Sequence, residues 1–402
     1  MSRSIATRHR RIRFTSFTTT DVATLLKAPS PSSKGVVVFT TQERDRRIAE
    51  SADLRERIER LKERWLVGLH HNWHDFAFTY DPLFDFSMAG EEDLIEVSGT
   101  PFPVVPLDAC NFVPSYFTPA SAEPFWDVLY IARAVGFKRL PEFLQCIRTL
   151  YDRGYDYRVL LISPMPPFKR SDRPSVFYEL RQVYESMFSL EERARFTLLD
   201  PTFGYPFPFD LETIAHFYRS SRIFVHFAND ERRCRVAGYA WACGLPVVTT
   251  DAVASLLPAV ERHPPAYYKA REFAQFPDRI VEAIEHGPDE ASREAQHSVS
   301  EADTVPELLG WLESLLGAPL SSADREEMAL GGLGLRLGRH HGIGGPGPNT
   351  VPMEVDALVT LLESDPERVT QAVAIAEDPE HELAGTTPGP APPSRLRRWA
   401  SR

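Results

Sequence analysis

The sequence has little of what marks secreted, zinc-binding or membrane-spanning proteins. It has four cysteines in 402 residues and no CxxC pair, so neither a disulfide framework nor a zinc knuckle is expected. No stretch approaches the roughly 20 apolar residues that a spanning helix requires. Five arginines precede Asp21, but no apolar signal-peptide run follows them. We expect a cytoplasmic protein whose basic N-terminus touches the inner face of a membrane at most peripherally.

Positively charged residues are fewer than negatively charged ones. The chain has 45 Lys and Arg against 56 Asp and Glu, a formal net charge of −11, which argues against general nucleic-acid binding as the main function. With 43% apolar and 25% charged residues, the composition is that of an ordinary globular protein. A chain of 402 residues exceeds what one hydrophobic core usually supports, so we expect two domains.

Composition shifts predict four parts along the chain. Residues 1–34 are expected to form a flexible basic N-terminus, and residues 35–122 a reduced α/β domain. Residues 123–318 are expected to form a Rossmann-like domain, and residues 319–402 a Gly/Pro-rich, largely disordered tail with one short helix.

The Rossmann-like part alternates between strand and helix patterns. Strands are predicted at 128–132, 158–162, 196–199, 223–227 and 247–249, with helices at 140–154, 176–188 and 211–219. Strict alternation over short connections predicts a parallel, doubly wound sheet. Ligands of such sheets bind at the carboxyl ends of the strands.

Charged residues follow two of these strands. Arg133 and Lys138 come after the first strand and just before a helix, where cations add to the free amides of the helix N-terminus. That combination suits a diphosphate, although surface charges on a loop are the simpler alternative. Glu231 follows the fourth strand, where its carboxylate could accept hydrogen bonds from sugar hydroxyls.

Two motifs in this region resemble a known family. They are Ile131-Ala-Arg-Ala-Val-Gly-Phe-Lys138 and Gly238-Tyr-Ala-Trp-Ala-Cys-Gly-Leu-Pro-Val-Val248. Over about residues 100–260 the chain resembles the retaining nucleotide-sugar glycosyltransferases of family 4. The resemblance implies a GT-B-like fold: two Rossmann-like domains facing across a cleft, the N-terminal one on the acceptor side and reduced here. It also implies a nucleotide-diphosphate sugar as co-substrate, with no cofactor and no metal.

The resemblance assigns roles to the charged residues. It implies that Arg133 and Lys138 bind the donor diphosphate and offset the charge on the leaving group, and that Glu231 contacts the transferred sugar. Asp200, at a later strand end, lies where the base is expected to be recognised through backbone groups.

The chain also departs from the family pattern. Tyr239 stands where the family has a second glutamate that binds the ribose hydroxyls, and a phenol cannot chelate two hydroxyls as a carboxylate does. Arg232 and Arg233 replace glycines of the loop that approaches the sugar. These three residues complete the expected donor-binding set, in which the arginines either add phosphate contacts or obstruct the site.

The loop after residue 70 is rich in histidine. His70, His71 and His74 are acceptor-side candidates that could contact a sugar hydroxyl. Two histidines four apart could share a metal on a helix, but the aromatic surroundings favour a loop, where helix spacing does not apply. Asp81 and Asp85 are further acceptor candidates.

The sequence therefore predicts a glycosyltransferase of polysaccharide biosynthesis that moves a sugar from a nucleotide diphosphate to a glycan, lipid-linked or small-molecule acceptor with retention. The alternatives are a non-catalytic GT-B-like scaffold that binds a sugar nucleotide, and a sugar-nucleotide epimerase.

Overall fold

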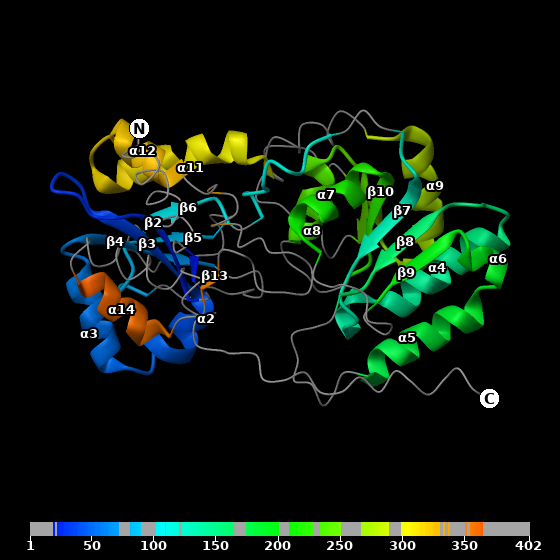
Figure 1. The fold of residues 1–402 in the computed structure, drawn as a ribbon, viewed down its shortest axis with the longest axis horizontal. Helices are drawn as coiled ribbons and strands as arrows, with labels where there is room; N and C mark the ends of the chain where they lie inside the picture. The colour runs from blue at the N-terminus through cyan, green and yellow to red at the C-terminus, as the bar shows by residue number, and fades with distance from the viewer. Residues whose placement is uncertain are drawn as a thin grey trace, which may run out of the picture.

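The chain forms two α/β lobes, each with a central sheet between helices (Figure 1). The computed structural model describes residues 19–20, 22–71, 81–89, 102–108, 110–119, 123–164, 174–200, 209–228, 234–250, 267–288, 299–329, 333, 337, 350–351 and 354–364. Because helices cover both faces of both sheets, the predicted α/β class with two Rossmann-like, doubly wound domains is confirmed.

The C-lobe is built on an all-parallel sheet, six-stranded over the described residues, with the order β12-β11-β10-β7-β8-β9. Numbered along the lobe, this order is 6-5-4-1-2-3, the doubly wound arrangement in which the order reverses between the first and fourth strands. The strands are β7 (Trp126–Ile131), β8 (Val159–Ile162), β9 (Phe196–Leu199), β10 (Ser221–His226), β11 (Val247–Thr250) and β12 (Tyr267–Ala270).

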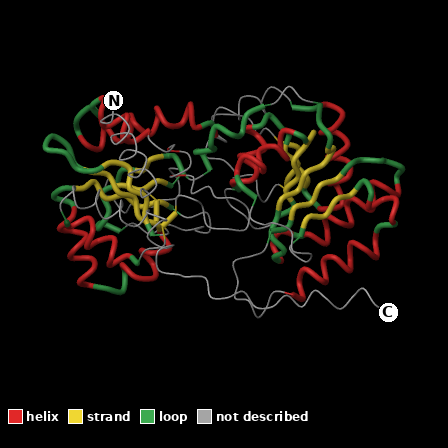
Figure 2. Tube along the Cα trace, viewed as in Figure 1, coloured by secondary structure: helices red, strands yellow, loops and turns green. Residues whose placement is uncertain are grey.

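Alternating side chains of this sheet enter two separate cores. Val128 and Tyr130 of β7 face α4, α5 and α9, whereas Leu129 and Ile131 face α7 and α8. Figure 2 shows the helices of this lobe outside its strands. The helices are α4 (Leu140–Asp152), α5 (Pro174–Met187), α6 (Leu190–Arg193), α7 (Leu211–Arg219), α8 (Arg235–Ala242) and α9 (Phe276–His286), with short helical turns η3 (Gly136–Lys138) and η7 (Phe273–Gln275).

The N-lobe has a mixed sheet, seven-stranded where the chain is described, with the order β13-β1-β2-β3-β4-β5-β6. The strands from β3 to β6 are parallel, whereas β2 pairs antiparallel to both β1 and β3. The strands are β1 (Thr19–Thr20), β2 (Ala23–Lys27), β3 (Gly35–Thr40), β4 (Trp65–His70), β5 (Phe86–Met88), β6 (Val104–Val105) and β13 (Thr350–Val351).

Segments from the C-terminal quarter complete the N-lobe. Leu308 and Leu312 pack on the face of β3 that carries Val36 and Val38, whereas Leu358 and other α14 residues pack on the opposite face with α3. The helical segments of this lobe are α2 (Thr41–Glu43), the π-helical turn η1 (Arg44–Ile48), α3 (Ala52–Leu61), α11 (Glu301–Leu316), α12 (Ser322–Ala329) and α14 (Val355–Glu363).

The structure differs here from the expected domain limits. Residues 301–316 were expected in the C-terminal domain and residues after 319 in a tail, but α11, α12, β13 and α14 all join the N-lobe. Residues 23–27, expected in a flexible N-terminus, form the fully buried strand β2. The physical reason is the open sheet: the short N-terminal part supplies too few helices to cover both faces.

Two crossing segments pair with each other between the lobes. The Val113 amide donates to the Val299 carbonyl at 3.0 Å, and the Glu301 amide donates to the Val113 carbonyl at 3.3 Å. The Thr304 hydroxyl also donates to the Asn111 carbonyl at 2.9 Å. Phe117, on the first crossing segment, is buried in the C-lobe core beside α8. The chain thus crosses between the lobes twice, and the two crossing segments pair with each other. We call residues 110–117 and 299–304 the interlobe strap.

Candidate functional site

The reversal of strand order locates the candidate site. β7 and β10 are neighbours, yet the chain leaves β7 for α4 on one face of the sheet and leaves β10 for α8 on the other. The connections therefore diverge at the carboxyl ends of these strands, where open α/β sheets bind ligands. Residues 132–139 and 227–234 form the two connections.

The first connection carries both predicted cations. Arg133 is half-buried and Lys138 is 8% exposed. The backbone of Lys138 is fixed, because its amide donates to the Val135 carbonyl at 3.0 Å and its carbonyl accepts from the Tyr130 hydroxyl at 2.5 Å. Its ammonium lies 5.3 Å from the centre of the Phe137 ring. Two cations thus stand just before the amino end of α4, an arrangement that favours a phosphate group.

The second connection is anchored at both ends. The Thr250 hydroxyl donates to the Ala228 carbonyl at 3.1 Å, and the Thr249 hydroxyl donates to the His226 carbonyl at 3.2 Å. The His226 Nε2 lies 3.0 Å from the Cys234 sulfur, which ties the end of β10 to the residue before α8. Glu231, Arg232 and Arg233 lie outside the described residues, so their predicted contacts stay predictions.

Tyr239 is a packed residue of α8. Its side chain is 6% exposed and its ring stacks on Phe117, with ring centres 4.1 Å apart. The Tyr218 ring meets it edge-on at 6.0 Å. Burial raises the pKa of the Tyr239 phenol above its usual value, so the hydroxyl stays protonated. The ring therefore joins the interlobe strap to α8, and contact between its hydroxyl and a donor stays a prediction.

Asp200 forms an ion pair inside the C-lobe. It follows β9, is fully buried and receives a hydrogen bond from Arg181 at 2.7 Å. Neutralisation by Arg181 offsets the cost of burying the carboxylate. Residues 201–208, which include the backbone expected to read the base, lie outside the described part of the chain.

The predicted acceptor-side histidines belong to the other lobe. His70 ends β4 and His71 follows it, and both side chains are nearly buried. The His71 amide donates to the Met88 carbonyl at 2.9 Å, which places both residues at the carboxyl end of the parallel strands β4 and β5. His74 lies outside the described residues.

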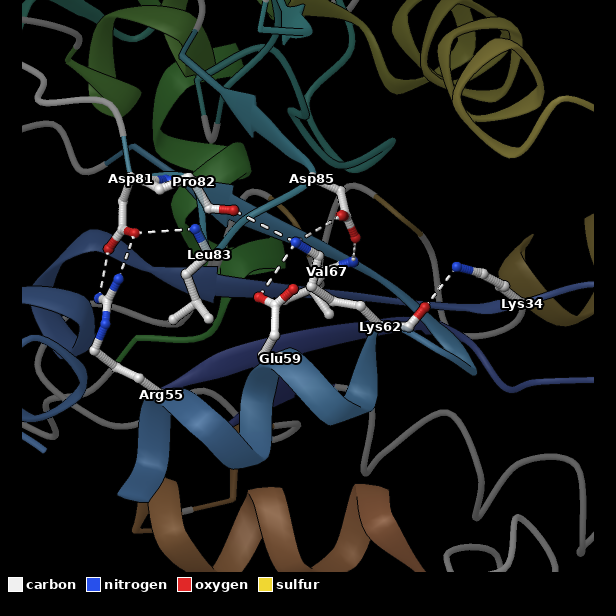
Figure 3. A network of polar contacts seen from close by, with 9 residues as sticks. All are labelled: Lys34, Arg55, Glu59, Lys62, Val67, Asp81, Pro82, Leu83 and Asp85. Atoms are coloured by element: carbon white, nitrogen blue, oxygen red, sulfur yellow. Dashed lines mark hydrogen bonds and ion pairs between the residues drawn. The ribbon is translucent and has the colours of Figure 1, made fainter. Parts of the chain in front are cut away.

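Asp81 and Asp85 have structural partners (Figure 3). Asp81 accepts two hydrogen bonds from Arg55 of α3, each 2.9 Å long, and Asp85 accepts one from the Val67 amide at 2.8 Å. Burial opposes ionisation of Asp81, but the hydrogen bonds from Arg55 and the Leu83 amide, together with the charges of Arg55 and Arg44, outweigh it and lower the pKa of the carboxyl. These contacts anchor the segment before β5 to α3 and β4.

The described residues contain neither a metal-binding cluster nor a membrane-spanning helix. Over the described ranges, no cluster of three or more His, Cys, Asp or Glu side chains is placed to hold a metal ion. No helix in the described part of the chain is long and apolar enough to span a bilayer.

Sequence reasoning missed Arg139, which immediately follows Lys138. Its backbone has φ 52° and ψ 42°, the left-handed region, and its side chain reaches Glu142 and Phe273. No local pattern indicates this conformation, because Arg at a helix N-cap is atypical and the contact with Phe273 spans 134 residues of sequence.

Several solved structures are similar to this chain over part of its length. TarM superposes with a TM-score of 0.47 at 12% identity, covering 70% of this chain and 55% of TarM. The pneumococcal O-GlcNAc transferase GtfA, solved with UDP and GlcNAc, gives 0.44 at 12% identity, covering 64% of this chain and 53% of GtfA. Anabaena HepE, solved with UDP, gives 0.43 at 15% identity, covering 65% of this chain and 76% of HepE.

The chain thus spans about half the length of TarM and GtfA. Neither the family models nor the curated proteins contain a match to this sequence. All three TM-scores are below 0.5, so the proposed function rests on this chain's own residues.

Proposed function

We propose that the protein is a glycosyltransferase that transfers a sugar from a nucleotide-diphosphate donor to an acceptor with retention at the anomeric carbon. The observation that carries the proposal is the pair Arg133 and Lys138 on the β7–α4 connection, at the point where the strand order reverses. Two cations beside a helix N-terminus suit a ligand with clustered phosphate charge.

The chemistry follows from that placement. The bond between the anomeric carbon and the diphosphate breaks, the bond to the acceptor oxygen forms, and the departing diphosphate takes the hydroxyl proton. Negative charge grows on the diphosphate as its bond breaks, and Arg133 and Lys138 stabilise it without a metal. Glu231 contacts the transferred sugar, while Arg232 and Arg233 add phosphate contacts.

The N-lobe supplies the acceptor side in this proposal. His70 and His71 lie at the carboxyl end of β4, which is the edge at which a parallel sheet binds ligands. One of them, or His74, contacts the acceptor hydroxyl. A glycan, a lipid-linked sugar or a small molecule fits this role.

The test uses Lys138→Met, which keeps the apolar stem of the side chain and removes its charge. Release of nucleotide from UDP-glucose, GDP-mannose and ADP-glucose is measured with and without sugar acceptors. We expect the wild type to turn over one donor. Lys138→Met should lower the rate of nucleotide release at least about 100-fold, the order of magnitude for removal of one charge-stabilising group. The matched control is Lys34→Met, at an exposed N-lobe lysine. Turnover by Lys138→Met within twofold of wild type contradicts the proposal.

A second candidate function is a non-catalytic protein that binds a sugar nucleotide. The buried stack of Tyr239 on Phe117 favours it, because that position then contributes packing and no carboxylate. Binding of a nucleotide sugar without release of nucleotide, with every acceptor supplied, would support this candidate. Turnover of the donor into an isomeric nucleotide sugar without acceptor would instead indicate an epimerase.

A further inference from the structure

Arg139 has a strained backbone beside the candidate phosphate site. Among the described residues, it is the one non-glycine residue with positive φ, and it lies between Lys138 and the first residue of α4. The left-handed region brings the β-carbon of an L-residue close to the following carbonyl oxygen, so arginine is unfavourable there. Such conformations persist where the surrounding structure holds them, and they cluster at ligand sites.

Two side-chain contacts hold Arg139 in place. One guanidinium nitrogen lies 2.6 Å from the Glu142 carboxylate, one turn along α4. The guanidinium carbon also lies 4.9 Å from the centre of the Phe273 ring, in the turn that follows β12. A planar guanidinium suits both contacts at once, because it can form an ion pair at its edge while a ring covers its face.

Phe273 in turn contacts residues on the other side of the candidate site. The Phe273 ring is nearly parallel to that of Phe227, with ring centres 5.9 Å apart and planes at 7°. Phe227 directly follows β10 and also stacks on Phe276 at 3.8 Å. Arg139 therefore connects the segments that follow β7, β10 and β12, all at the carboxyl edge of the sheet.

The amino end of α4 lacks the usual side-chain cap. Ser, Thr, Asp or Asn at the N-cap commonly accepts a hydrogen bond from the first amides of a helix. Arg139 occupies this position and forms no such side-chain hydrogen bond. A carboxylate at the cap would add negative charge to this helix end, whereas Arg139 offsets the charge of Glu142 in the first turn of α4.

We propose that Arg139 is a positioning residue: its left-handed backbone, held by Glu142 and Phe273, directs Lys138 and the amino end of α4 toward the diphosphate of the donor. The inference rests on the proposed function of this site. Arg139 acts through Lys138, because its own guanidinium is engaged by Glu142 and Phe273.

The first test is Arg139→Gly. Glycine adopts positive φ without strain, which offsets the loss of the Glu142 and Phe273 contacts, so the melting temperature should stay close to that of the wild type. Without those contacts, nothing in the side chain holds this one backbone conformation. Binding of UDP, GDP and ADP is measured by calorimetry. We expect the Kd of the nucleotide that the wild type prefers to rise at least tenfold. Arg153→Ala, which removes an arginine and its ion pair with Asp278 at the other end of α4, is the matched control and should leave Kd unchanged.

Four further variants separate positioning from charge. Phe273→Leu and Glu142→Gln each remove one contact of Arg139 and should weaken nucleotide binding in the same direction. Arg139→Lys keeps the charge but loses the planar group, so it should resemble Arg139→Gly. In a Lys138→Met background, Arg139→Gly should have little further effect, because residues that act through one another are non-additive.

The outcomes distinguish the inference from the proposed function. If the wild type binds none of the three nucleotides, both are overturned. If the wild type binds one and Arg139→Gly binds it equally well, only the inference is overturned. Full binding by Arg139→Lys beside a weakened Arg139→Gly would identify a direct charge contact, which also overturns a positioning role.

Discussion

The two lobes share a layered architecture, but one is built from a continuous segment of the chain and the other from segments far apart in sequence. The C-lobe sheet is all-parallel and its strands come from one continuous segment, residues 126–270. The N-lobe sheet is mixed, and α11, α12, β13 and α14 from the far end of the chain complete it. A continuous lobe can be recognised from local patterns, whereas a lobe closed by distant segments depends on contacts that no local pattern shows.

The largest effect is expected when the segments that complete the N-lobe, α11 to α14, are removed. Deletion of residues 301–402 exposes the apolar faces that α11 and α14 cover, and we expect the N-lobe to unfold while the C-lobe stays folded. Each fully buried Leu or Val contributes about 1.5–3 kcal/mol, whereas a whole domain is stable by only about 5–15 kcal/mol. Calorimetry of the full chain and the deletion variant measures the effect. A deletion variant that retains every wild-type transition would contradict the account.

A single substitution in α14 removes part of the packing of this helix on the N-lobe. Leu358 is buried against α3 and the N-lobe sheet, so Leu358→Ala should cost about 2–5 kcal/mol. Leu190→Ala is the control, because Leu190 is 79% exposed and its substitution should change stability by less than about 0.5 kcal/mol. Denaturant unfolding measures both. Equal effects of the two variants would mean that α14 does not hold the N-lobe.

Tyr239 offers a test at the junction of the lobes. Glutamate, the residue expected there from the family resemblance, would place a carboxylate in the stack with Phe117. Tyr239→Glu should destabilise the protein by about 1–3 kcal/mol or more at neutral pH, because the ionised group loses its hydration.

That loss should shrink as the pH falls, since a protonated carboxyl is less costly to bury. Tyr239→Phe, which keeps the ring, is the control and should be nearly neutral. Thermal unfolding of both variants from pH 5 to pH 8 measures the difference. A Tyr239→Glu variant as stable as wild type at pH 8 would show that this position is not a packed one.

The smallest expected effect is a pH dependence in the C-lobe. Hydrogen bonds from Arg148 and from the Ser189 amide lower the pKa of Glu192 to about 2, below its usual 4.5. A lowered folded-state pKa stabilises the protein fully above the unfolded value, and the contribution is lost as the pH falls from about 4.5 toward 2. Unfolding of wild type and Glu192→Gln across this range should show a flatter profile for the variant. Parallel profiles would contradict the ion pair.

The sequence predicted most of the C-lobe. The pattern at 196–199 and that at 211–219 agree with β9 and α7 to the residue, because short loops and strict alternation leave few alternatives. In the N-lobe, β2 lies within the part that was expected to be a flexible N-terminus. Lys27 made the burial of this strand unpredictable, because a lysine is buried only when it is paired. Its partner, Asp324 of α12, is distant in sequence.

The candidate site was predictable in part. Arg133 and Lys138 follow a strand and precede a helix, and these local features predicted their position at the carboxyl edge of the sheet. The reversal of strand order at that point comes from the structure. The packing of Tyr239 on Phe117 was not predictable, because 122 residues of sequence separate the two rings. The positive φ of Arg139 was not predictable either, since it depends on Phe273.

The central claim is that the β7–α4 connection binds the diphosphate of a nucleotide. Its most direct test is the thermal stability of the wild type and of the double variant Arg133→Ala/Lys138→Met with UDP, GDP and ADP. At 100 times its Kd, a bound nucleotide should stabilise the wild type by about 2.7 kcal/mol and leave the double variant unchanged. Equal stabilisation of both proteins, or none of the wild type, would contradict the claim.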